Sequence, residues 1–276
     1  MKGAMDLSWG QMAFAYAFPL ITYLICNIRH IQRGKDLVSS AFRMTVQLMI
    51  AGYILTFILS KPSPRITLLV LIVMEIFAVF TIFQRVKTPL TPELKRAAAL
   101  SQWMGTLFCI GYFLFLVVRP RPWFDPQYFI PLGGMMIGNA MTAVALAMTR
   151  LIDAVREGKD QIEAALILGA EPQRAMKPSI DKTFDAAILP TLSSMAGMGI
   201  VILPGMMTGQ ILSGSPPNTA IKYQIAIMLA ILGTSSLCVL TFLTLASRSF
   251  FNKKKQLVFE DQLLALREKK KSKRGK

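Results

Sequence analysis

Long apolar stretches, separated by short polar or basic segments, run along the whole sequence. Each is close to the roughly 20 residues that a helix needs to cross a hydrocarbon core about 30 Å thick. Lipid offers the backbone no hydrogen-bond partner, so we expect helices, and the alternating strands of a barrel are missing from the pattern. The apolar stretches cover residues 7–28, 44–59, 66–83, 100–118, 129–148, 186–212 and 224–246. The pattern predicts an all-α polytopic membrane protein with about seven transmembrane helices.

Composition supports a membrane protein. The 276 residues are 53% hydrophobic and only 17% charged, and the mean hydropathy of +0.48 is high for a soluble domain. The first apolar stretch is too long for a removable signal peptide, and it lacks a basic leading segment and a small-residue cleavage site. We therefore expect this stretch to remain as a span.

The formal net charge of +16 could indicate nucleic-acid binding, but the basic residues cluster between particular spans. With the N-terminus outside, 25 of the 31 Lys and Arg residues fall on the cytoplasmic side. This bias predicts an N-out, C-in topology and no nucleic-acid partner. Residues 1–250 would form the transmembrane domain, followed by a basic cytoplasmic tail over 251–276. The tail is expected to lie on anionic lipid as an amphipathic helix, the alternative for its last residues being a solvated disordered end.

Polar side chains inside the spans are candidates for a transport path. Glu75 lies near the middle of the third span, where a carboxylate costs about 2.5 to 3.5 kcal/mol, so we expect it to face the bundle interior. A structural hydrogen bond and a transport role both stay open for Glu75. Arg43 and Gln47 stand one helical turn apart in the second span, although Arg43 could equally anchor at lipid headgroups. Further oxygen-bearing candidates are Asn139, Gln210 and Gln224. No residue of the fourth span stands out chemically.

One short motif occurs twice, as GMMIG over 134–138 and as GMMTG over 205–209. Glycines four residues apart leave one helix face bare and allow close packing, so the two motifs could pack against each other near the outer ends of their spans. The methionines could supply thioether ligands to a soft metal such as Cu(I), or could simply fill gaps in the packing. The residues concerned are Gly134, Gly138, Gly205 and Gly209, with Met135, Met136, Met206 and Met207.

Residues 150–185 form the longest polar interval between spans, mixed in charge and helical in composition. The interval is too long for a turn and too short for a folded domain, so we expect it to contact another protein. Catalytic motifs are missing: the sequence contains no P-loop, HExxH or GxSxG pattern, and His30 is its single histidine. We therefore expect no enzymatic activity and no cofactor bound by this chain.

Several segments together resemble the FetB family, the membrane subunit of a bacterial iron-export ABC transporter with plant relatives linked to aluminium tolerance. The matching pieces extend over almost the whole chain, to about residue 256, and their joint occurrence is specific. They are Arg43, Gln47, Leu48, Gly52, Tyr53 and Leu55, then GNAM over 138–141, LGA over 168–170, LPGMMTG over 203–209 and AIKYQI over 220–225.

This resemblance implies a permease in the bacterial plasma (inner) membrane, assembled as two copies with two copies of a separate ATP-binding subunit that holds ATP and Mg. The loop that contacts the ATPase in ABC permeases would map to Glu163, Ala164, Ala165, Gly169 and Ala170. The sequence departs from that pattern, because the ILP at 188–190 lies much further beyond the glycine than in importers. Iron as the substrate rests on the resemblance, since the repeated motif offers sulfur whereas iron(II) prefers nitrogen and oxygen.

The leading hypothesis is an ABC permease that exports a metal ion, iron by resemblance. An ABC permease for a non-metal substrate is one alternative. A proton- or ion-coupled secondary carrier that uses Glu75 as a relay is another, and it needs no ATPase partner. A membrane scaffold that recruits proteins through its loop and tail would transport nothing.

Overall fold

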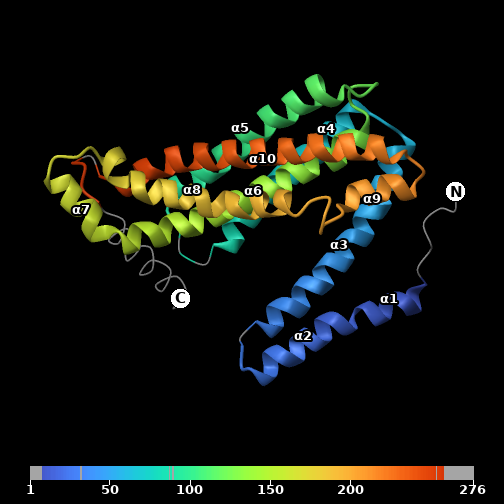
Figure 1. The fold of residues 1–276 in the computed structure, drawn as a ribbon, viewed down its shortest axis with the longest axis horizontal. Helices are drawn as coiled ribbons and strands as arrows, with labels where there is room; N and C mark the ends of the chain where they lie inside the picture. Colours follow the sequence, from blue (N-terminus) through green and yellow to red (C-terminus); the bar gives the residue numbers. More distant parts are fainter. Residues whose placement is uncertain (1–7, 32, 87, 89, 253, 258–276) are drawn as a thin grey trace, which may run out of the picture.

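The computed structural model describes residues 8–31, 33–86, 88, 90–252 and 254–257. In this part of the chain every long element is a helix (Figure 1). The helices are α1 (Trp9–Ala15), α2 (Ala17–Ile28), α3 (Gly34–Ser60), α4 (Pro64–Arg85), α5 (Pro92–Tyr112), α6 (Pro126–Glu157), α7 (Lys159–Ile167), α8 (Pro172–Ala196), α9 (Gly205–Leu212) and α10 (Pro217–Ser247). A π-helical turn, η1 (Phe113–Val118), extends α5, and a 3-10 turn, η2 (Arg248–Phe250), follows α10.

Six helical stretches of the described chain are long and apolar enough to cross a membrane. They are Trp9–Ile28, Asp36–Ser60, Pro64–Arg85, Pro92–Val118, Pro126–Glu157 and Pro217–Phe250. These helices confirm the predicted polytopic all-α architecture.

The stretch over 186–212, predicted as one continuous span, is divided between two helices. Helix α8 ends at Ala196 and α9 begins at Gly205, with an irregular loop between them. Gly199 in this loop has a φ of +85°, which a residue with a side chain rarely adopts, and Pro204 precedes α9. Hydropathy alone did not reveal the break, because the loop residues are as apolar as the helices they connect.

Local sequence explains where several helices begin and end. Proline occupies the first turn of α4, α5, α6, α8 and α10, where its missing N–H costs nothing. At the start of α5 the Thr91 side chain accepts a hydrogen bond from the Leu94 N–H at 3.3 Å. Helix α6 extends beyond its apolar part to Glu157, and Gly158 caps its C-terminal end.

The core lies between α4, α5, α6, α8 and α10, with α6 and α10 packed along each other at its centre (Figure 1). One apolar cluster, which includes Met148, Leu151 and Phe242, extends toward α7. A second, which includes Leu132, Met136 and Ile227, joins α4, α5, α6 and α10. In the picture α7 and α9 lie at opposite ends of this bundle. We call these the α7 end and the α9 end.

Helices α1, α2 and α3 form an arm that diverges from the bundle (Figure 1). No residue of the span Trp9–Ile28 is buried within the chain, and Ile58 is the one buried residue described in the span Asp36–Ser60. Arg43 of the arm contacts Phe77 of α4 in the bundle. Its guanidinium lies 5.8 Å from the centre of the Phe77 ring, which allows a cation–π interaction. The apolar surface of the arm therefore faces lipid or another protein.

Candidate transport path and coupling site

A polar cluster lies inside the bundle around Glu75. The Glu75 side chain is fully buried on α4, and the Thr106 hydroxyl of α5 donates a hydrogen bond to its Oε1. One turn earlier on α5, the Gln102 amide donates to the Ile137 carbonyl of α6 at 3.3 Å. From α10, the Cys238 thiol lies 4.0 Å from the Gln102 carbonyl oxygen. The predicted interior location of Glu75 is confirmed, and the cluster connects four helices.

Two buried polar atoms of this cluster have no hydrogen-bond partner among the described residues: Glu75 Oε2 and Gln102 Oε1. An unsatisfied buried polar group costs about 1 to 3 kcal/mol, so a native bundle retains few of them. Oxygen atoms in this situation can hold a proton or a hard cation. The cluster is thus the strongest candidate for a binding site inside the bundle.

Sequence reasoning missed Gln102 and Thr106, because no residue of the fourth span was expected to stand out. A signal was present: the two polar residues are four positions apart in an apolar span and therefore share one helix face. The spacing predicts that the two side chains share a face, but the helix that this face contacts depends on the tertiary structure.

The other path candidates do not join Glu75 within this chain. Arg43 and Gln47 are exposed on α3, in the diverging arm. Asn139 is exposed on α6, and its amide donates to the Met135 carbonyl of the same helix at 2.8 Å. Gln210 and Gln224 lie on α9 and α10, and the side-chain oxygen of each is buried with no partner in the part of the chain that the structure describes. The predicted set therefore falls into separate regions.

The two glycine motifs do not pack against each other in the structure. A Cβ atom at Gly134 would meet Met74 of α4 at 2.8 Å, so this glycine serves the contact between α4 and α6. At Gly138, Gly205 and Gly209 a Cβ would have no atom within 4 Å. Both motifs lie in regular helices, α6 and α9, but the break after α8 makes α9 a short separate helix, and neither of its glycines has a neighbouring atom within 4 Å of the space that a Cβ would fill.

The four methionines of these motifs are also distributed unequally. Met136 is buried in the second apolar cluster, against which Met135 and Met206 are partly packed. Met207 lies outside that cluster and lines a cavity at the break between α8 and α9. The sequence repeat therefore does not correspond to one four-sulfur site.

Helix α7 and the turn that follows it contain the residues that were expected to contact an ATPase. Ile162 anchors the helix in the core, Glu163 and Ala165 are half-buried, and Ala164 is exposed. At its C-terminal end Ile167 and Leu168 are 86% and 88% exposed. A short helix at the end of the bundle thus presents two adjacent apolar side chains to its surroundings.

The backbone after α7 has a defined form. Gly169 has a φ of +88°, its N–H donates to the Leu166 carbonyl at 3.0 Å, and the Ala170 N–H donates to the Ala165 carbonyl at 2.9 Å. These two bonds form the Schellman motif, which ends a helix with a glycine in the left-handed conformation. The exposed tip of α7 is therefore held in one orientation relative to α8.

The beginning of the predicted tail packs against the same corner. The Asn252 carboxamide oxygen accepts hydrogen bonds from the N–H groups of Lys254 and Gln256, both at 2.9 Å, which closes a tight turn. On either side of this turn, Phe251 and Leu257 pack against the first apolar cluster. Residues 251, 252 and 254–257 thus belong to the folded α7 end, whereas residues 253 and 258–276 of the predicted tail lie outside the described residues.

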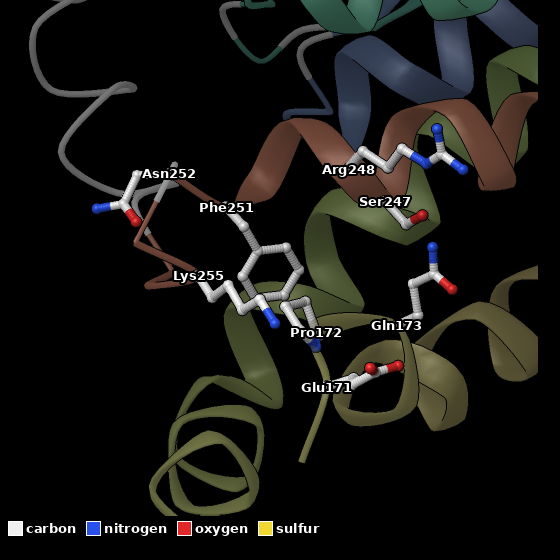
Figure 2. A pocket seen from close by; sticks show the side chains of 8 residues that line it. All are labelled: Glu171, Pro172, Gln173, Ser247, Arg248, Phe251, Asn252 and Lys255. Carbon is white, nitrogen blue, oxygen red and sulfur yellow. The ribbon is translucent and has the colours of Figure 1, made fainter. Parts of the chain in front are cut away.

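Figure 2 shows the pocket that this turn forms with the start of α8. The Phe251 ring and the Lys255 side chain reach toward Pro172 and Glu171, and the pocket has a volume of about 330 Å³. A second groove of about 740 Å³ separates Lys254 and Lys255 from Glu163 and Gly169. The surface of the α7 end therefore has two hollows, formed by α7, the start of α8 and the residues that follow η2.

Comparisons with known proteins cover nearly the whole chain. Residues 9–251 match the model of the Uncharacterised protein family (UPF0014). The UPF0014 membrane protein slr1647 of Synechocystis sp. is 32% identical over 92% of this chain and 98% of its own length. The Probable iron export permease protein FetB of Escherichia coli is 33% identical over 90% and 94%, respectively. Protein ALUMINUM SENSITIVE 3 of Arabidopsis thaliana is 32% identical over 89% and 88%.

No solved structure matches this chain. The likeness to FetB and to the plant protein agrees with the family that the sequence motifs indicated, and the apolar helices agree with an integral membrane protein. The chain belongs to the UPF0014 family of membrane proteins.

Proposed function

We propose that this protein is the membrane-spanning permease subunit of an ABC transporter that exports a metal ion, iron by analogy with FetB. A separate subunit would bind ATP and Mg and hydrolyse the ATP, and the assembly would contain two copies of each chain. The protein would lie N-out and C-in in a bacterial inner membrane. The observation that carries this proposal is the exposed apolar tip of α7, Ile167 and Leu168.

An aqueous surface rarely retains two adjacent apolar side chains of this exposure without a partner. Burying a side chain of this size contributes about 1.5 to 3 kcal/mol, so inserting both into a groove would supply much of a docking free energy. The tip is also preorganised, because the Schellman motif at Gly169 orients it and Ile162 anchors the helix. A rigid apolar tip suits insertion into another protein better than contact with a small molecule.

Helix α7 contacts both α6 and α8, so a push on its tip would reach two parts of the bundle. Helix α6 carries the Ile137 carbonyl that binds Gln102 beside Glu75, whereas α8 leads to the break before α9. Closure of the ATP-binding subunits would move these helices as rigid elements and alternate access to a path between them. The printed name of FetB supports metal export, and the buried oxygens around Glu75 suit a hard or borderline cation.

The test is docking and metal efflux measured with a candidate ATP-binding subunit. Ile167→Glu and Leu168→Glu each place a charge in the docking groove, so we expect partner affinity and partner-dependent metal efflux to fall at least about tenfold, the equivalent of about 1.4 kcal/mol. Asn218→Asp is the matched control, since it adds the same charge at an exposed position near the opposite end of the bundle. Efflux that depends on the partner but is unchanged in both α7 variants would contradict the docking assignment.

The buried Glu75 also favours a second candidate function, a proton- or ion-coupled carrier. Such a carrier would transport its substrate in vesicles that contain this chain alone, under a proton gradient and without ATP. Transport under these conditions would replace the ABC proposal, whereas transport that requires both the partner and ATP would exclude the carrier.

A further inference from the structure

The break between α8 and α9 opens a cavity of about 440 Å³ against the first half of α10. Its wall contains four methionines from three parts of the chain: Met195 and Met198 around the end of α8, Met207 on α9 and Met228 on α10. Only Met207 belongs to the repeated motif that the sequence singled out. The other three come together through tertiary structure.

A polar side chain marks this cavity as more than a packing gap. Gln224 is buried and lines the same cavity, and its Nε2 lies 3.6 Å from the Met198 sulfur. Its Oε1 has no partner among the described residues, so a buried acceptor remains beside the thioethers. A structure that gained nothing from this acceptor would favour an apolar side chain at position 224.

The broken helix gives the cavity its form. Irregular backbone at membrane depth is tolerated where it lines a cavity or is buried in protein, and discontinuous helices of transporters commonly line binding sites. Here the Gly199 N–H donates to the Ile202 carbonyl and the Ile202 N–H to the Gly197 carbonyl, both at 3.0 Å. This tight loop holds Met198 and Gly199 at the cavity wall.

We propose that the cavity binds a soft monovalent cation of the Cu(I) class through the thioether sulfurs. Thioethers are neutral, soft ligands that select such ions, whereas carboxylate and water ligands suit harder divalent ions. No charged side chain lines the cavity in the described part of the chain. The flexible methionine side chain can turn its sulfur toward an ion. This site is additional to the iron path, and binding at it does not require the proposed ATPase.

The test uses the full chain in lipid nanodiscs with Ag(I) as a redox-stable probe. Each methionine is followed by mass spectrometry during mild peroxide oxidation, with and without Ag(I). We expect Ag(I) to slow oxidation of Met195, Met198, Met207 and Met228 at least severalfold. Met49 and Met104, which are 46% and 63% exposed outside the cavity, should be oxidised at the same rate in both samples. A large excess of Mn(II) should give no protection.

A variant measurement checks the same site by stoichiometry. The double substitution Met198→Leu and Met207→Leu should lose about one bound Ag(I) per chain, whereas Met49→Leu with Met104→Leu should lose none. The three cysteines contribute the same background to every sample. Unchanged silver binding with no protection of the four methionines would overturn the proposal and leave a cavity filled by an apolar ligand such as an acyl chain. Because no ATP-binding subunit is present, this result is independent of the proposed function.

Discussion

Gly169 is a residue whose backbone conformation leaves little freedom for substitution. Its φ of +88° disfavours any residue with a Cβ, although no atom lies within 4 Å of the space that a Cβ would fill. We predict that Gly169→Ala disorders the tip of α7 at a cost of about 1 kcal/mol and weakens partner-stimulated ATPase activity, whereas Gly169→Asn retains more of it. Stimulation is measured with purified subunits in nanodiscs.

Gly52→Ala is the control for this prediction, because Gly52 lies in α3 with ordinary helical geometry and open space around its Cβ. It should leave stimulation unchanged. If Gly169→Ala also stimulates as well as the wild type does, the orientation of the tip is unimportant for docking.

Thr106 separates the two interpretations of Glu75. Its hydroxyl donates to the Glu75 carboxyl, and Thr106→Val removes that donor while keeping the side-chain shape. If the Glu75 cluster binds the cation, binding depends on the carboxylate and its orientation, so we predict that Thr106→Val and Glu75→Gln lower metal efflux at least about tenfold with protein levels within about twofold. Efflux is normalised to inserted protein.

The matched control is Thr244→Val on α10, where the hydroxyl is exposed and bonds only to its own helix at Leu240. If efflux and protein level fall in parallel in the Glu75 and Thr106 variants, the cluster is a structural hydrogen-bond network. In that case the transport path lies elsewhere.

At the scale of the element, helices were easier to predict than their contacts. The proline and threonine at the start of α5 and the glycine after α6 mark boundaries through local backbone chemistry, which is readable from the sequence alone. Hydropathy likewise located Glu75 inside a span, and burial followed because an unpaired carboxylate cannot face lipid. Gln102 and Met198 were missed because their significance depends on neighbours that are distant in the sequence.

The break between α8 and α9 is another feature that the hydropathy pattern did not predict. Apolar composition is a property of side chains, whereas continuity of a helix is a property of the backbone. The glycines at 197 and 199 and Pro204 contained the relevant signal, but the apolar run around them dominated the prediction.

Residues 251, 252 and 254–257 behave as an element of the α7 end. Phe251 packs against the first apolar cluster beside Pro172, so we predict that Phe251→Ala destabilises this corner by about 1 to 3 kcal/mol and accelerates proteolysis near residues 168–171. Limited proteolysis of the purified protein measures this. Phe57→Ala, at a site 61% exposed on α3, should leave cleavage unchanged. If Phe251→Ala and Phe57→Ala are cleaved at the same rate, the Phe251 contact does not stabilise α7.

At the scale of the whole molecule, the exposed loop between α8 and α9 bears on assembly. Ile200 and Val201 are 90% and 82% exposed within the single chain, and the loop lies beside α10 between its ends (Figure 1). Irregular backbone is not stable against lipid, so a second copy of the chain is the expected cover. We predict that Ile200→Cys gives a covalent dimer with a short thiol-reactive cross-linker in native membranes.

Leu69→Cys on α4, at a site 59% exposed, serves as the control, and the wild type measures background from the native cysteines. Cross-linking of Ile200→Cys above both supports a dimer interface at this loop. A cross-linking yield of Ile200→Cys equal to that of Leu69→Cys would indicate that the dimer interface lies elsewhere, and the diverging arm would be the next region to test.

The connection of α7 to both α6 and α8 has a thermodynamic consequence. If docking of a partner on the α7 tip changes the affinity for a cation in the bundle, then the cation must change the affinity of docking by the same factor. Helices α6 and α8, which α7 contacts, would transmit this effect in both directions. If that factor exceeds one, the chain with its cation bound would dock the proposed partner more tightly than the empty chain does.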